Sequence, residues 1–191
     1  MRLPIEWLHD HVHPDLSTRE LATRLAMTGT EVDRILRHGV DALDAFVVGR
    51  VLAAERHPDA DRLSVCRVDL GAQETTIVCG APNVAAGQAV AVARPGAVMP
   101  DGTTLGRARL RGVESDGMIL AEDELAIGTA HDGIMVLDDE LVPGTPLDDV
   151  LPIRSDVLEL EITPNRPDCL SVYGVAREVH AATGAALAEP P

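Results

Sequence analysis

The sequence between Phe46 and about Leu137 repeats short β-rich runs that are separated by Gly, Pro and Asn. The runs are FVVGRVLAA, LSVCRVDL, TTIVCGA, QAVAVARPG, TLGRARLRG and DGIMVL. Short strands at regular intervals with turn residues between them are typical of a β-sandwich or barrel. Five or six strands in about 90 residues favour a small Greek-key barrel such as an OB-fold. The run AEDELAI, residues 121–127, predicts a short helix late in this segment.

The segment before these runs has an α/β pattern. STRE at residues 17–20 is a capping box, in which a helix starts after Ser17 and Glu20 reaches back to it. Apolar residues then recur at helical spacing, and Gly29 is a suitable stop. EVDRILRHG, residues 31–39, predicts a short strand.

The segment after the β-rich runs returns to the same pattern. In DVLELEIT, apolar Leu158, Leu160 and Ile162 alternate with polar residues, which predicts a strand with one buried face. NRPD is a turn, after which Asp168 or Ser171 could cap a helix that stops at Gly184. The expected apolar stripe of that helix is Val172, Val175, Ala176, Val179 and Ala182.

Together the segments predict an α+β fold, in which both chain ends form a small α/β domain around an inserted OB-fold. We expect residues 1–39 to be the first part of the α/β domain and residues 40–151 to be the OB-fold. Residues 152–191 would complete the α/β domain and end in a linker.

The charge and the composition limit how this chain could bind nucleic acid. Its formal net charge is −15, and its 16 basic residues are all arginine. Non-specific binding to nucleic acid depends on neutralising phosphates, so the negative net charge of this chain opposes such binding. Trp7, Phe46 and Tyr173 are the only aromatic residues, which leaves few platforms for stacked bases. Any contact with RNA is expected to be local or to occur within a larger assembly.

No apolar run approaches the roughly 18 residues that a membrane span needs. The start, MRLPIEWLHDHVH, lacks the pattern of a signal peptide, so a cytoplasmic protein without membrane contact is expected. The three cysteines are odd in number and far apart, which argues against a disulfide framework.

HPDADRLSVC, residues 57–66, combines His, Asp and Cys and is either a metal site or a turn that enters a strand. In a strand, Cys66 shares a face with Val68 and Leu70 and would pack inward as a small apolar residue. The strand is the favoured interpretation, because zinc sites usually combine four Cys and His ligands at recognisable spacing. HDHVH at residues 9–13 lacks a second ligand cluster, so no metal site is expected.

GRARLRG supplies the best candidate surface for RNA. In an extended strand, Arg107, Arg109 and Arg111 project on one face about 6.8 Å apart, and Ala108 and Leu110 face the core. Guanidinium groups bind phosphates in a bidentate way. A solvated strand face balanced by neighbouring acidic residues remains the alternative.

Other residues extend this candidate set. Residues 40–150 contain 8 arginines and 19 Asp or Glu, so a strong autonomous RNA-binding surface is not expected. Asn83 in CGAPNV is a candidate ligand-binding residue, although its side chain is more consistent with tying its own turn. Asn165 and Arg166, in the Pro-bracketed turn TPNRPDC, are candidates for organising a domain junction. The further arginine candidates are Arg50, Arg62, Arg67 and Arg94.

Five blocks occur in the order typical of one family: HPDADRLSVCRVDLG, IVCGAPNVAAGQAVAVARPGAVMP, LRGVESDGMILAEDELAIG, HDGIMVL and TPNRPDCLSVYGVAREVHAATG. They resemble the N-terminal region of the bacterial phenylalanyl-tRNA synthetase β subunit, and the resemblance covers essentially the whole chain. It implies an OB-fold tRNA-binding module inserted in a small α/β domain.

The resemblance also implies the context of this region. The full enzyme is an α2β2 assembly that charges phenylalanine tRNA using ATP and magnesium. Its editing, catalytic-like and anticodon-binding domains lie beyond Pro191, and its aminoacylation site belongs to the α subunit. We therefore expect no catalytic residue and no cofactor in this chain. Its partners would be phenylalanine tRNA, the α subunit and the rest of the β subunit.

Three alternatives remain. The chain could be a protein-interaction or architectural module that does not itself bind tRNA, which the negative charge favours. It could be a free-standing tRNA-binding protein of the same module family, although the segment TPNRPDCLSVYGVAREVHAATG counts against that. A metalloenzyme is the remote third.

Overall fold

The structure is a computed structural model that describes residues 1–190, and the chain divides into two compact units. One unit combines Met1–His38 with the segment that starts at Ser155, and the other is Gly39–Arg154. We call them the terminal unit and the central unit. Each has its own hydrophobic core.

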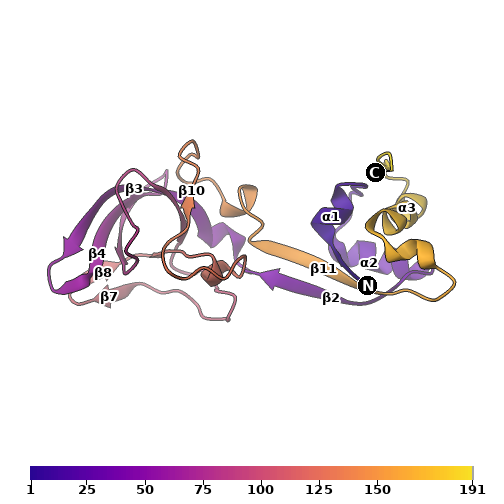
Figure 1. The fold of residues 1–191 in the computed structure, drawn as a ribbon, viewed down its shortest axis with the longest axis horizontal. Coiled ribbons are helices and arrows are strands. Elements are labelled where there is room, and N and C mark those ends of the chain that lie inside the picture. The colour runs from indigo at the N-terminus through magenta and orange to yellow at the C-terminus, as the bar shows by residue number, and fades with distance from the viewer. Residues whose placement is uncertain (191) are drawn as a thin grey trace. The chain divides into compact units, whose positions relative to one another are not determined.

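The terminal unit is built on a three-stranded sheet in the order β1-β11-β2, in which β1 runs antiparallel to β11. Figure 1 shows β2 and β11 side by side, with α1, α2 and α3 near the N-terminus. The elements are β1 (Arg2–Pro4), α1 (Ile5–His9), α2 (Thr18–Met27), β2 (Glu31–Gly39), β11 (Arg154–Glu161), the 3-10 helix η4 (Pro167–Leu170) and α3 (Val172–Thr183).

Both predicted helices start and end where their capping residues indicate. The Ser17 hydroxyl accepts a hydrogen bond from the Glu20 backbone N–H, and the Glu20 carboxylate accepts one from the Ser17 backbone N–H at 2.9 Å. Ser171, one of the two predicted caps of α3, accepts from the Gly174 backbone N–H at 3.0 Å. Gly184 ends α3 in the left-handed region that favours glycine.

The core of the terminal unit joins its helices to its sheet. Leu158 and Leu160 of β11 are buried as their alternation predicts, and Val175, Ala176 and Val179 of α3 are fully buried. The other buried members are Leu3, Ile5, Leu8, Val12, Leu21, Leu25 and Cys169.

The central unit contains the β-rich runs. Its main sheet has the order β10-β6-β3-β4-β5, and β9 also pairs with β6. The elements are the 3-10 helix η1 (Leu43–Ala45), β3 (Phe46–His57), β4 (Ala60–Asp69), β5 (Glu74–Cys79), β6 (Ala89–Ala93), β7 (Ala108–Leu110), β8 (Val113–Ser115), β9 (Met118–Ile119), η2 (Asp123–Leu125), β10 (Val136–Leu137) and η3 (Leu147–Asp149). β7 and β8 form a separate two-stranded sheet.

The main sheet is buried on both faces where β3 and β6 pair. Successive side chains of a strand point to opposite faces, so Phe46 and Val48 enter one hydrophobic cluster while Val47 and Val51 enter another. All five residues of β6, Ala89–Ala93, are fully buried.

The closed barrel that the sequence predicts for the central unit is not confirmed. Among the described residues, the hydrogen-bonded path from β10 to β5 is not joined end to end, so the sheet is open by its pairing. AEDELAI forms the predicted short helix as the 3-10 helix η2, Asp123–Leu125, which ends where Ala126 adopts a left-handed φ of 57°. In residues 1–190, no helix is both long and apolar enough to span a membrane.

Candidate nucleic-acid interface

The GRARLRG segment does not form the expected row of three arginines on one strand face. Strand β7 covers only Ala108–Leu110 and is exposed throughout, so Ala108 and Leu110 do not face the core. Arg111 lies outside the strand, in a turn with Gly112, and their φ angles are 46° and 90°. Two successive positive φ angles are the geometry of a type I′ hairpin turn. This turn reverses the chain after three strand residues and separates Arg111 from the row.

The exposed face of the β7–β8 hairpin carries charges of both signs. The Arg107 Nε atom lies 2.7 Å from the Asp116 carboxylate, and the Arg109 Nε–H donates to the Gly112 carbonyl at 3.2 Å. On the main sheet, Arg67 pairs with Glu74 at 3.6 Å. Arg107 and Arg67 are therefore each paired with an acidic neighbour.

Two other candidate arginines brace the central unit from within. Arg50, whose side chain is 23% exposed, donates to the carbonyl oxygens of Gly87 at 3.0 Å and Leu141 at 2.9 Å. Arg94 donates to the carbonyl oxygen of Asp44. Arg50 thus ties two loops to β3, and Arg94 ties the end of β6 to η1.

Asn83 does not tie its own turn. Its amide nitrogen donates to the Ile134 carbonyl at 2.9 Å, and its amide oxygen accepts from the Ile134 backbone N–H at 2.9 Å. The pair spans 51 residues of sequence. Because both ends of the side chain are engaged, Asn83 joins two loops.

Arg62 is exposed, and so is Arg56, which sequence reasoning missed. Neither guanidinium group has a hydrogen-bond or ion-pair partner among residues 1–190. Arg56 is the second-last residue of β3, next to the HPDAD turn, and that position is the one sequence signal that could have added it to the candidates.

His57, between these arginines, connects two hairpins. The residue is 5% exposed, its Nδ1 accepts from the Asp59 backbone N–H at 3.0 Å, and its Nε2 lies 3.1 Å from the Leu110 carbonyl oxygen. Because Nδ1 accepts this hydrogen bond, Nε2 carries the ring hydrogen and donates to the Leu110 carbonyl. The β3–β4 turn is thereby attached to the β7–β8 turn.

The HPDADRLSVC stretch forms the end of β3, a turn and the predicted entry into β4. Cys66 lies in β4 and is fully buried with Val68, as the alternation predicts. Burial raises the pKa of the Cys66 thiol to about 11, and nearby Cys79 adds to the effect.

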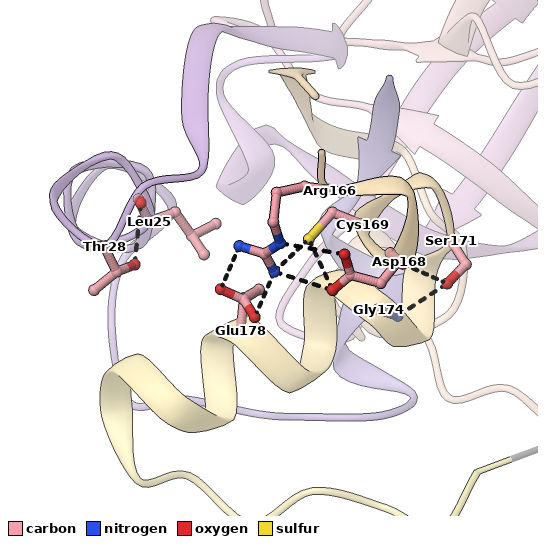
Figure 2. A network of polar contacts seen from close by, with 8 residues as sticks. All are labelled: Leu25, Thr28, Arg166, Asp168, Cys169, Ser171, Gly174 and Glu178. Atoms are coloured by element: carbon pink, nitrogen blue, oxygen red, sulfur yellow. Dashed lines mark hydrogen bonds and ion pairs between the residues drawn. The ribbon is translucent and has the colours of Figure 1, made fainter. Parts of the chain in front are cut away.

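The TPNRPDC turn forms an ion-pair network that Figure 2 shows from close by. The Arg166 guanidinium lies 3.0 Å from Asp168, 2.7 Å from Glu178 of α3 and 3.0 Å from the Cys169 sulfur. Asn165 beside it is exposed.

Asp168, Cys169 and Glu178 are also the only group of three metal-type ligands that residues 1–190 bring together. The Arg166 guanidinium bonds to all three, so a cation already lies between the two carboxylates. The hydrogen bond from Arg166 holds the pKa of the Asp168 carboxyl below its ordinary value. This arrangement fits an internal brace and not a metal centre.

Comparison with known proteins gives the family. Residues 46–146 match the family described as "Putative tRNA binding domain". The chain is 50% identical over 191 residues to the phenylalanine–tRNA ligase beta subunit of Nitratidesulfovibrio vulgaris, and 45% identical over 190 residues to that of Syntrophus aciditrophicus. Each match covers 100% of this chain and 24% of the relative, in its N-terminal part.

The solved structure of a MetRS-related protein from Pyrococcus horikoshii is 25% identical in sequence. The match covers 52% of this chain and 85% of that protein's chain. Its TM-score of 0.40 is too low to establish a shared fold. The sequence matches establish the relationship: this chain belongs to the tRNA-binding domain family and is homologous to the N-terminal part of phenylalanine–tRNA ligase beta subunits.

Proposed function

We propose that this chain is the tRNA-binding N-terminal region of a phenylalanine–tRNA ligase β subunit. The observation that carries the proposal is the family match over residues 46–146, which fall inside the central unit. The 50% identity over 191 residues to a β subunit supports the same assignment. In this proposal the sheet of the central unit is an OB-type module, and the terminal unit is its α/β support.

The proposed role is binding, without chemistry at this chain. Arginines of the central unit approach the phosphate backbone of phenylalanine tRNA, while the α subunit and the rest of the β subunit provide the reaction. In this proposal ATP and magnesium act there. A cytoplasmic location is part of this proposal.

The test is a titration of this chain with unmodified phenylalanine tRNA at about 50 and 200 mM salt, the range over which phosphate contacts lose affinity steeply. We expect binding that weakens as salt rises. A tRNA of another identity serves as the control, and backbone recognition predicts a similar affinity for it. An absence of binding at low salt contradicts the proposal.

A second candidate function is supported by the charge. With a net charge of −15 and several arginines already paired, the chain would serve as an architectural part that binds other protein domains. That function predicts no salt-dependent binding of tRNA at all, so the same titration separates the two.

A further inference from the structure

The unpaired arginines of the central unit gather at one place. Of the eight arginines in residues 40–150, five donate hydrogen bonds or form ion pairs within this unit: Arg50, Arg67, Arg94, Arg107 and Arg109. The remaining three, Arg56, Arg62 and Arg111, have no such partner in the part of the chain that the structure describes. All three are exposed and lie at the turns of β3–β4 and β7–β8.

We propose that these two turns form one phosphate-binding element, the hairpin tip, in which Arg56, Arg62 and Arg111 bind the phosphodiester backbone of RNA. This inference rests on the proposed function and gives it a location. The predicted row on β7 is replaced by a cluster from two hairpins.

The link between the turns gives the tip a defined geometry. Leu110, directly before Arg111, accepts a hydrogen bond from His57, which directly follows Arg56. The register pairs Arg56 with Ser64 and His57 with Ala60, so Arg62 lies in the irregular stretch between these pairs. The buried His57 ring therefore holds the backbone positions of the three arginines near one another.

The backbone at Arg111 supports a functional reason for its side chain. Its φ of 46° is one of only two positive values at non-glycine residues in residues 1–190. Type I′ turns favour Asn, Asp or Gly at this position, whose side chains tolerate the left-handed region. Strained residues of this kind cluster at functional sites. Because the exposed Arg111 side chain has no partner within the described residues, no contact of that side chain in the fold offsets the backbone strain.

The composition of the tip identifies the kind of contact. Phe46 is the only aromatic residue in the central unit and is fully buried, so bases have no exposed aromatic ring to stack on. Asp59 and Asp61 lie between Arg56 and Arg62 at the β3–β4 turn and are exposed, so the net positive charge of the tip is small. Binding would therefore depend on direct guanidinium–phosphate contacts, with little dependence on base sequence.

The decisive comparison uses two triple variants with the same change in charge. R56Q/R62Q/R111Q removes the tip, and R19Q/R24Q/R177Q removes three exposed arginines from α2 and α3 of the terminal unit. We expect the tip variant to bind phenylalanine tRNA roughly 1,000-fold more weakly, since each of the three lost charge-assisted hydrogen bonds costs about tenfold. Its salt slope should fall by about 2.7, or 0.9 per phosphate contact. The control triple should change both quantities far less.

Two results overturn the tip without touching the proposed function: equal weakening in both triple variants, or unchanged binding in the tip variant while the unmodified chain binds. If the unmodified chain does not bind, the proposed function and the tip fail together.

A single substitution covers the case in which the triple variant fails to fold. In R111N the new residue suits the turn, so Tm should stay the same or rise while affinity falls by about tenfold. Wild-type affinity in a folded R111N chain would remove Arg111 from the site.

Discussion

At the residue scale, arginines in this chain have two kinds of environment. Arg166 is engaged on several sides by Asp168, Glu178 and Cys169, whereas Arg56 and Arg62 of the hairpin tip have exposed guanidinium groups. Engaged arginines brace the fold, and exposed ones are available to a ligand. Sequence alone ranked Arg50 and Arg94 beside Arg62, although both donate to backbone carbonyls.

The Arg166 brace predicts a pH dependence. Because Arg166 lowers the pKa of Asp168 below the ordinary 3.8, the folded state binds fewer protons there than the unfolded state. The brace therefore stabilises the fold above that pH, and the contribution is lost as pH falls through the lowered pKa. As the pH is lowered below about 4, the unfolding free energy of R166Q should fall less than that of the unmodified chain, as measured by urea denaturation. R177Q, with the same charge change on α3, should keep the wild-type profile, and identical profiles for all three proteins would contradict the role of Arg166.

At the element scale, β3 depends on the absence of a side chain at Gly49. A Cβ atom there would lie 2.7 Å from Val92 of β6 and 2.8 Å from Val68 of β4. These distances are well inside normal contact, and both neighbours are fully buried. The strand therefore packs between its two partners only with glycine at this position.

We expect G49A to lower the unfolding free energy by about 1–3 kcal/mol, the usual cost of overpacking a core. Gly106 offers a matched control, because a Cβ atom added there meets no atom within 4 Å. G106A should thus be close to neutral in the same thermal or urea measurement. Equal stability of G49A and the unmodified chain would show that β3 can shift without cost.

At the scale of the whole molecule, the central unit has the properties of an independent domain. Its two hydrophobic clusters contain only residues from 39–154, and its ends meet where the Val40 backbone N–H donates to the Ile153 carbonyl at 3.0 Å. A chain of residues 39–154 should fold by itself and unfold cooperatively in urea. The transition is followed by circular dichroism, because the only tryptophan, Trp7, lies outside this range and its fluorescence cannot report on it. A non-cooperative transition would show that the central unit needs the terminal unit.

The sequence by itself determined the features that depend on neighbours along the chain. The cap residues Ser17 and Ser171, the stop at Gly184 and the inward face of Cys66 all follow from local spacing, and the structure confirms them. The family resemblance was also readable from the order of five sequence blocks, and the comparisons confirm it.

Only the tertiary structure decided which polar side chains are free to bind. Asn83 meets Ile134 across 51 residues, and His57 meets Leu110 across 53. No periodicity records such pairings, because strand and helix patterns specify which face a residue occupies and not which distant segment covers it. The expected row of Arg107, Arg109 and Arg111 failed for the same reason: the Arg111–Gly112 turn reverses the chain, and His57 attaches that turn to another hairpin.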